Sequence, residues 1–411
     1  MTETLKPKDA AQVLEAVKWA VAEGMPLEIL GRGSKRGFGR AVKPGLGLDL
    51  SELSGIGRYE PSELFMTAFA ATPMAEIEAA LRQNNQQMAF EPADLGPLLG
   101  GDEDRGSIGG AIACNLAGPR RIKAGAARDH FLGFSAVSGR GEVFKSGGTV
   151  VKNVTGFDLS KLIAGSFGTL AVMTEVTFKV LPAPEKTRTV LVLGLPDAAA
   201  AMAMAKALGS AHEVSSAAHL PKAAAGRSQV SYVAAAGRAV TAIRVEGPGP
   251  SVEHRCRALK ELLKGKGDIE ELHSENSQAL WREIRDAALL GPADGRPGGR
   301  QVWRLSVPPM AGPGAAEALA RELAGEAFYD WGGGLVWLAI AAQPDAGHEK
   351  VRAAVAAAGG HATLVRADDE VRARVPVFEP QSARLSALTA RIKEAFDPKG
   401  VLNPGRMYEG V

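Results

Sequence analysis

Apolar residues recur at helical spacing close to the start of the chain. In the stretch VLEAVKWAV, residues 13–21, most of them fall three or four positions apart and share one face, which is the period of an amphipathic helix. Asp9 precedes the stretch at a capping position, and Gly24 follows it, as expected for the two ends of a helix. The pattern predicts a helix between Asp9 and Gly24.

Strand-like and helix-like segments then alternate through the first 184 residues. Short apolar runs bounded by turn residues are typical of strands. They occur at 27–30, at 64–70, on both sides of the Gly139-Arg140-Gly141 turn, and at 169–181. Thr72 and Pro73 occupy the positions of an N-cap and a first helical residue, and residues 158–164 predict another short helix.

The stretch PAPEK at 182–186 marks the first change in composition and predicts a linker. Residues 198–225 are rich in alanine and predict a helix followed by a loop. Strand-like runs (TVLVLGL, VWRLSVP, LVWLAIA) and helical patterns (252–263, 349–358, 382–395) follow, with no internal repeat visible in the sequence. We therefore predict three parts, at 1–184, 185–370 and 371–411.

Composition excludes several classes of protein. The chain has 411 residues and a net charge of +2, whereas a nucleic-acid-binding protein concentrates much more positive charge. Its two cysteines, Cys114 and Cys256, are far apart, which argues against a disulfide scaffold, a structural zinc site and an iron–sulfur cluster. No signal peptide and no apolar run of ~20 residues is visible, so we expect a cytoplasmic protein.

The loop GRGSKRGFG, residues 31–39, combines four glycines with three cations. Its spacing does not match a P-loop, and no helical pattern follows it as a Rossmann fingerprint would require. A loop of this composition can present several backbone N–H groups to an anion. The alternative is a solvated basic turn, and the loop alone does not separate the two.

Five motifs taken together resemble flavoproteins of the vanillyl-alcohol-oxidase (PCMH-type) superfamily. They are PLEILGRGSKRGFG, FEPADLG, GSIGGAIACNLAG, KNVTGFDLSKLIAGSFGTLAVMTEV and FDPKGVLNPGRMY, in this order. Four later segments, LWREIRD, VWRLSVPP, DWGGGLVWL and GHATL, are similar to the FAD-binding E subunit of bacterial glycolate oxidase. The resemblance implies an α+β fold: a PCMH-type FAD-binding domain of two α+β subdomains, a second α+β cap domain, and a C-terminal segment that returns to the flavin domain.

The same resemblance implies which residues bind FAD. The first loop would wrap the pyrophosphate with backbone N–H groups, the second would line the pyrophosphate and the ring, and a third segment would pass the adenine and ribose. The residues are Gly31, Arg32, Gly33, Ser34 and Lys35; Pro92 in a preceding turn; Gly106, Ser107, Gly109, Gly110 and Asn115; and Gly165, Thr169 and Val172. Alternatively, Lys35 is a solvated cation and the second motif is a helix start packed against a sheet.

We expect the FAD to be non-covalent. Some members of the superfamily tether the flavin through a histidine or cysteine, but the first glycine loop contains neither. Cys114 lies in the second motif, where certain relatives place a second tether. Its alternative role is that of a small buried apolar residue.

The resemblance also implies an activity, the oxidation of glycolate to glyoxylate by hydride transfer to flavin. Electrons would pass to a larger FAD-linked glycolate oxidase subunit and to an iron–sulfur subunit. Arg285 and Arg304 are candidates to hold the substrate carboxylate, because a guanidinium can bind both oxygens. His361 is the candidate base. Surface or interdomain ion pairs, and a structural histidine, are the alternatives.

One departure limits this implication. Related catalytic D subunits and D-lactate dehydrogenases carry a GDGN-x-H segment and a cluster of metal ligands, whereas this chain lacks GDGN and has seven scattered histidines. We therefore expect no metal site, no nucleic-acid partner and at most peripheral membrane contact through the complex. A self-sufficient FAD-dependent 2-hydroxy-acid dehydrogenase of the D-lactate type and a non-catalytic flavin-bearing scaffold remain alternatives.

Overall fold

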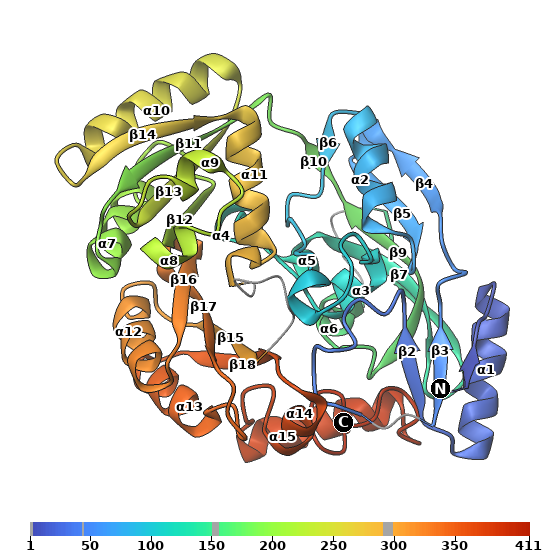
Figure 1. The fold of residues 1–411 in the computed structure, drawn as a ribbon. Coiled ribbons are helices and arrows are strands. Elements are labelled where there is room, and N and C mark those ends of the chain that lie inside the picture. The colour runs from blue at the N-terminus through green and yellow to red at the C-terminus, as the bar shows by residue number, and fades with distance from the viewer. Residues whose placement is uncertain (1–2, 43–44, 150–155, 291–298) are drawn as a thin grey trace. The chain divides into compact units, whose positions relative to one another are not determined.

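The computed structural model describes residues 3–42, 45–149, 156–290 and 299–411 (Figure 1). The chain forms two compact units. The first contains Met1–Ala117, Gly125–Ala183 and Pro376–Val411, and the second contains Gly118–Ala124 and Pro184–Val375. The segment Gly118–Ala124, expected inside the first domain, thus belongs to the second unit. Residues 152–155 of the KNVTGFD motif lie outside the described residues.

The chain begins with a small parallel sheet in the first unit. Its strands are β1 (Thr4–Leu5), β3 (Leu46–Asp49) and β2 (Leu27–Leu30), in that spatial order. The predicted first helix is confirmed as α1 (Ala10–Glu23), and the Asp9 carboxylate accepts the Gln12 N–H at its start. Gly24 ends it with a φ of 62°. The apolar face of α1 packs on the sheet through Val13 and Val17.

An antiparallel sheet of five strands forms the larger part of the first unit. The order is β4 (Ile56–Glu60), β5 (Phe65–Phe69), β9 (Ala171–Lys179), β7 (Phe131–Ser138), β8 (Val143–Gly147). Around it lie α2 (Met74–Gln83), α3 (Ile108–Ala113), α5 (Ala127–His130) and α6 (Leu159–Ile163). The predicted strand 169–181 is divided, because β10 (Leu181–Pro182) turns away to pair with β6 (Gln86–Gln87).

The predicted N-cap of α2 was wrong. The capping position is held by Pro73, and the Thr72 hydroxyl donates instead to the carbonyl of Phe69 at 2.7 Å. The Gly55 N–H in turn donates to the Thr72 hydroxyl oxygen at 2.9 Å. Thr72 therefore stabilises the turn after β5 rather than the helix.

The C-terminal segment completes the first unit. It contains α15 (Ala383–Phe396), whose Ile392 and Phe396 pack on the core of the five-stranded sheet. The buried Lys393 ammonium donates to the Asp397 carboxylate at 2.7 Å and to the Thr169 carbonyl at 2.8 Å. Beyond the helix, Leu402 forms a parallel bridge with Leu27. Both ends of the chain thus share one core.

The second unit is built on one antiparallel sheet of eight strands (Figure 1). The order is β14 (Asp268–His273), β11 (Lys186–Leu193), β13 (Val240–Gly247), β12 (Ser216–Leu220), β16 (Glu326–Asp330), β17 (Leu335–Ala341), β15 (Arg300–Ser306), β18 (His361–Arg366). The longer helices are α7 (Asp197–Leu208), α10 (Gly249–Leu263), α11 (Ser274–Arg285), α12 (Gly312–Glu322) and α13 (His348–Ala357). The short ones are α4 (Arg121–Ala124), α8 (Lys222–Ala225), α9 (Ser231–Ala234) and α14 (Asp369–Arg374).

The eight-stranded sheet is a structural duplication. Each half runs strand, helix, two strands, helix, strand, and the spatial orders β14-β11-β13-β12 and β18-β15-β17-β16 correspond. The halves meet where His219 of β12 pairs with Tyr329 of β16. The Asp197 carboxylate bridges this junction, since it accepts the Tyr329 hydroxyl at 2.5 Å and lies 3.3 Å from the His219 ring.

The loop predicted after the alanine-rich helix was partly wrong. Helix α7 is present, but SAAHL at 216–220 forms the central strand β12. Alanine is depleted in strands, so the sequence gives little strand signal there. Tertiary contacts stabilise this strand, because it pairs with β13 and β16 and is buried along its whole length.

The two faces of the eight-stranded sheet carry different helices. On one face, helix α10 contacts α7, α7 contacts α12, and α12 contacts α13. The Arg352 guanidinium of α13 lies over the Trp303 ring of β15 at 5.4 Å. Helix α11 covers the opposite face of β11, where the Trp281 indole donates to the Thr189 hydroxyl. Among the described helices, none is long and apolar enough to cross a bilayer.

Removing the Lys393 ammonium should destabilise the protein. Lys393→Met leaves the buried Asp397 carboxylate without its cation, which costs about 3–5 kcal/mol of the free energy of unfolding. Urea unfolding followed by circular dichroism measures the loss. The exposed Lys399→Met is the control and should change it by less than about 0.5 kcal/mol. Equal stability of both variants would show that the pair contributes nothing.

Candidate functional site

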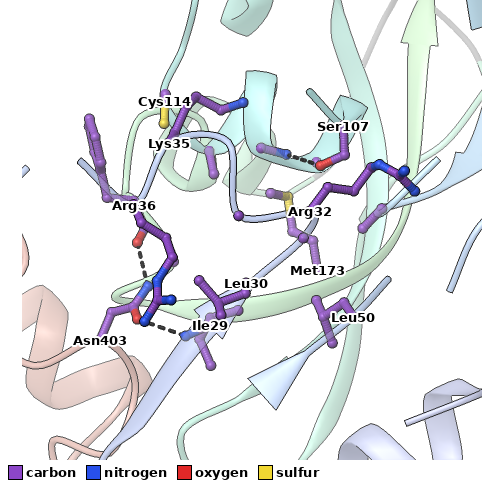
Figure 2. Close-up of a pocket in the computed structure, with 18 of the residues that line it drawn as sticks. Ile29, Leu30, Arg32, Lys35, Arg36, Leu50, Ser107, Cys114, Met173 and Asn403 are labelled. Carbon is purple, nitrogen blue, oxygen red and sulfur yellow. Dashed lines mark hydrogen bonds between the residues drawn. The ribbon is translucent and has the colours of Figure 1, made fainter. Parts of the chain in front are cut away.

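A pocket in the first unit lies beside the loop that follows β2 (Figure 2). The loop leaves the parallel sheet at Leu30 and does not continue into a helix. The lining residues come from this loop, from the start of α3, from β9 and its approach, and from the C-terminal segment. They include Gly31, Arg32, Gly33, Ser34, Lys35, Arg36, Ser107, Gly109, Gly110, Cys114, Phe167, Met173, Asn403 and Arg406.

The first loop presents a row of unused backbone donors. None of the N–H groups of residues 31–35 donates to another described residue. Gly33 has a φ of 75°, in the left-handed region that glycine enters without strain. Residues 31–35 are half-buried, and backbone N–H groups shielded from water normally have partners, so this row is suited to a ligand with several acceptor oxygens.

Two cations in the pocket have no carboxylate partner in the described structure. The Arg32 Nε atom is buried without a hydrogen bond, and the Lys35 ammonium donates to the Ser34 hydroxyl at 3.0 Å. Desolvation lowers the pKa of Lys35, against the nearby Cys114 and Asp94. Arg36 differs, because its guanidinium pairs with the Glu28 carboxylate. The pocket therefore favours a ligand with about two negative charges.

These donors fit the diphosphate of FAD. A diphosphate needs several hydrogen-bond donors at once, and the backbone reaches it only where side chains are absent or small. Arg32 and Lys35 would balance its charge. The structure thus brings together eight of the predicted residues, Gly31, Arg32, Gly33, Ser34, Lys35, Ser107, Gly109 and Gly110.

The second motif is also a helix start packed on a sheet. Ser107 caps α3, and its hydroxyl accepts the Gly110 N–H (Figure 2). The Gly109 N–H donates to the Ala70 carbonyl at 2.8 Å, and a Cβ on Gly109 would lie only 2.6 Å from that oxygen. The glycine permits this close approach of α3, which places Ser107 and Gly110 against the pocket.

The other predicted cofactor residues are not among the residues that line this pocket. Thr169 and Val172 are fully buried, and the Thr169 hydroxyl donates to the Ser166 carbonyl. The Asn115 side chain accepts the Arg128 N–H, and a Cβ on Gly165 would lie 3.3 Å from Asn115 Cβ. Pro92 and Gly106 complete this set, and the Gly106 carbonyl accepts the Met74 N–H. They shape the backbone that carries the lining.

Several lining residues were not predicted as site residues, and two of them, Asn403 and Arg406, hold the pocket together. The Arg406 guanidinium donates to the carbonyls of Lys35 at 3.0 Å and Arg36 at 2.8 Å. The Asn403 amide accepts the Ile29 N–H at 2.8 Å and donates to the Phe167 carbonyl at 2.7 Å (Figure 2). Both belong to the motif FDPKGVLNPGRMY, which we expected from the sequence to return to the flavin domain. The two polar side chains in this motif could have indicated a role at the site.

Cys114 lies at the edge of the pocket near Lys35 (Figure 2). Burial raises the pKa of the Cys114 thiol, although the charges of Lys35 and Arg406 oppose the shift. A thiol with a raised pKa stays protonated near neutral pH, and the thiolate is the nucleophilic form. This environment does not activate Cys114.

The three predicted catalytic residues belong to the second unit. The Arg285 guanidinium binds the adjacent Asp286 carboxylate through two bonds of 2.8 and 2.9 Å, so the ion-pair alternative fits its geometry. Arg304 of β15 lies opposite Thr363 of β18, and His361 begins that strand at an exposed position. No group of three or more potential metal ligands occurs among the described residues.

Comparisons with known proteins agree with this cofactor site. The FAD binding domain family matches residues 3–147, and the C-terminal domain of FAD linked oxidases matches residues 378–407. The glycolate oxidase subunit GlcE of Escherichia coli K12 is 36% identical over 96% of each chain. The glycolate oxidase subunit GlcD of Bacillus subtilis is 27% identical, over 74% of this chain and 68% of the relative.

Solved structures confirm the fold class. The 4-ethylphenol oxidase of Gulosibacter chungangensis superposes with a TM-score of 0.72 at 15% identity, over 99% of this chain and 89% of that chain. A p-cresol methylhydroxylase superposes with a TM-score of 0.71 at 13% identity, over 98% and 88%. At this identity the similarity establishes the α+β, PCMH-type fold alone.

Strain at Gly33 should weaken FAD binding. In Gly33→Val the φ of 75° becomes unfavourable, while the nearest atom to the new Cβ is 3.8 Å away, so the effect acts through the backbone. A strain of about 1–2 kcal/mol or more corresponds to an FAD affinity at least about tenfold weaker. Titration of the apoprotein with FAD, followed by flavin fluorescence, measures this affinity.

Gly24→Val provides a matched control. Gly24 also has a left-handed φ, 62°, with no atom within 4 Å of a new Cβ, but it lies outside the pocket. Gly24→Val should lower the free energy of unfolding about as much as Gly33→Val does, but it should leave the FAD affinity unchanged. If both variants bind FAD as the wild type does, Gly33 is only a turn residue.

Proposed function

We propose a function for this chain from one premise, that it belongs to the family of the glycolate oxidase subunit GlcE. The similarity to the Escherichia coli subunit extends over nearly the whole of both chains. The chain is an FAD-dependent oxidoreductase subunit for 2-hydroxy acids, and its reaction in a glycolate oxidase complex is the oxidation of glycolate to glyoxylate. The observation that carries this conclusion is the row of free N–H groups at residues 31–35 beside Arg32 and Lys35.

The first unit is proposed to hold FAD without a covalent bond. Backbone N–H groups of residues 31–35 donate to the diphosphate, and Arg32 and Lys35 offset its charge. Arg406 and Asn403 hold the loop in place. When bound, FAD supplies the acceptor for the hydride that leaves the hydroxyl-bearing carbon. The raised pKa of Cys114 supports the absence of a tether.

On the substrate side, Arg304 is proposed to bind the carboxylate and His361 to accept the hydroxyl proton. Arg304 lies opposite Thr363, and His361 lies opposite Ser306, two residues further along the same two strands. Side chains two residues apart share a face of a sheet and are about 7 Å apart along it. A small 2-hydroxy acid can contact both. Arg285 is already paired with Asp286, so we assign it a structural role rather than a role in substrate binding.

The chain is proposed to work as one subunit of a complex. The relatives GlcE and GlcD are named as subunits of glycolate oxidase, which supports a multi-subunit assembly. In the proposal, electrons pass to a larger FAD-linked subunit and to an iron–sulfur subunit. The location is the cytoplasm, with membrane contact only through the complex.

A self-sufficient dehydrogenase is the second candidate. The D-lactate dehydrogenase of Archaeoglobus fulgidus is 27% identical, over 47% of this chain and 41% of the relative. This partial match favours shared flavin binding more than shared catalysis. The sequence lacks GDGN-x-H, which favours the subunit.

The purified chain should be yellow and should release unmodified FAD on acid precipitation. Flavin absorbance is measured in the supernatant and in the pellet. Cys114→Ala should retain the same amount of FAD, because the thiol forms no bond to it. Flavin that stays with the wild-type pellet but not with the Cys114→Ala pellet would establish a tether. A colourless wild type would contradict the cofactor assignment.

The isolated chain should reduce an artificial dye with glycolate no faster than background, whereas the purified complex should reduce it readily. The reason is that the isolated chain lacks the metal-ligand segment of the related catalytic subunits. Dye reduction is measured with equal amounts of bound FAD in both samples. Rapid turnover by the chain alone would replace the subunit proposal with the self-sufficient dehydrogenase.

A further inference from the structure

In the second unit, two arginines stack on one tryptophan. The Arg121 guanidinium lies 4.7 Å from the centre of the Trp331 ring, and the Arg304 guanidinium lies 5.1 Å from it. A guanidinium is attracted to the face of an indole. Stacking uses the flat face of the cation and does not itself engage the N–H groups along its edge.

Several contacts fix Trp331 in place. Its φ of 52° is in the left-handed region, which is strained for a residue with a large side chain. Its indole N–H donates to the Gly118 carbonyl at 3.0 Å, and its backbone N–H donates to the Asp330 carboxylate at 2.7 Å. Strain of this kind persists where the surroundings over-determine it and is concentrated at ligand sites.

Arg121 is positioned by its neighbours in Gly118–Ala124. The adjacent Arg120 binds the Glu246 carboxylate of β13 through two bonds, at 2.7 and 2.9 Å. Together with the Gly118 carbonyl on Trp331, this pair fastens the segment to the second unit. Arg120 therefore anchors the segment through Glu246, and Arg121 stacks on the tryptophan.

Arg304 differs from most arginines of this unit because no carboxylate lies within ion-pair distance of it in the described ranges. Its neighbour Trp303 faces α13, so Arg304 points to the opposite face of the sheet. Burial and the charge of Arg121 lower the pKa of Arg304 to about 10, against the charge of Asp330. With Asp330 beside two arginines, one positive charge remains, and a desolvated cation is costly without an anion.

We propose that Arg121 and Arg304, stacked on Trp331, form the binding site for the carboxylate of the 2-hydroxy acid. The inference rests on the proposed function and adds Arg121 and Trp331 to it. With Asp330, the two arginines carry a formal charge of +1, which suits a monocarboxylate such as glycolate better than a dicarboxylate. Thr363, opposite Arg304 on β18, is placed to contact the same ligand.

The test uses the full-length chain and calorimetric titration with glycolate, because heat reports binding whether or not flavin is present. Arg121→Gln and Arg304→Gln should each weaken glycolate binding roughly ten- to a hundredfold, as expected for the loss of a charge-assisted hydrogen bond. The lysine variants at both positions keep the charge without the planar fork and should be intermediate. The neutral analogue glycolamide should bind weakly to all of them.

Arg321→Gln is the matched control, because Arg321 is an exposed arginine of the same unit, paired with Glu317. It should bind glycolate as the wild type does. FAD content and thermal unfolding of every variant separate lost binding from lost folding. In the assembled complex, the two glutamine variants should raise KM for glycolate more than they lower kcat.

Unchanged glycolate affinity in either glutamine variant would overturn the paired site, as would a wild-type chain that binds no glycolate. Weakened binding in both, with normal FAD content and unfolding temperature, supports it. A third outcome separates the two proposals. If the wild type binds glycolate but holds no FAD, and both glutamine variants lose glycolate binding, the carboxylate site stands and the proposed flavin function fails.

Discussion

The structure depends on how the backbone around the flavin pocket satisfies its polar groups. The N–H groups of residues 31–35 in the first glycine loop donate to no other described residue, and the carbonyls of this loop accept donors from the loop itself and from the C-terminal segment. Arg406 donates to the carbonyls of Lys35 and Arg36, and Asn403 bonds both Ile29 and Phe167. These bonds join residues more than 230 positions apart. The flavin pocket is therefore completed only when the C-terminal segment has folded back onto the N-terminal sheet.

The partners of the cations separate structural residues from ligand residues. Arg36 and Arg120 are held by carboxylates, Glu28 and Glu246, and their charge is already balanced. Lys35 has no such partner among the described residues, although burial makes its charge costly. All three lie in stretches that contain glycine and several basic residues, so composition alone could not rank them. The distinction comes from the neighbours that the fold supplies.

Local features of the fold could be predicted from the sequence, and long-range ones could not. The helix after Asp9 and the glycine loop at 31–39 carry their own signals, which are a cap, a 3.6-residue period and a required left-handed φ at Gly33. Strand β12 is alanine-rich and is a strand only because β13 and β16 pair with it. The role of Asn403 could not be predicted either, because its hydrogen bonds reach Ile29 and Phe167, which are distant in the sequence. The duplication is a matter of topology and leaves no visible repeat in the residues.

An arginine stacks on a tryptophan in each half of the eight-stranded sheet, at positions that the duplication does not relate, since Arg244 lies on β13 and Arg304 on β15. In the first half, Arg244 stacks on Trp281 at 4.6 Å, but α11 covers the pair and the Glu246 carboxylate lies 3.5 Å from the guanidinium. In the second half, Arg304 stacks on Trp331 without a carboxylate at ion-pair distance in the described structure. The same kind of contact is thus neutralised and covered by α11 at Arg244, whereas the Arg304 guanidinium keeps unused donors. A purely structural role would favour the first arrangement in both halves, because an unpaired desolvated cation lowers stability. The second arrangement is the one expected where a ligand brings the negative charge.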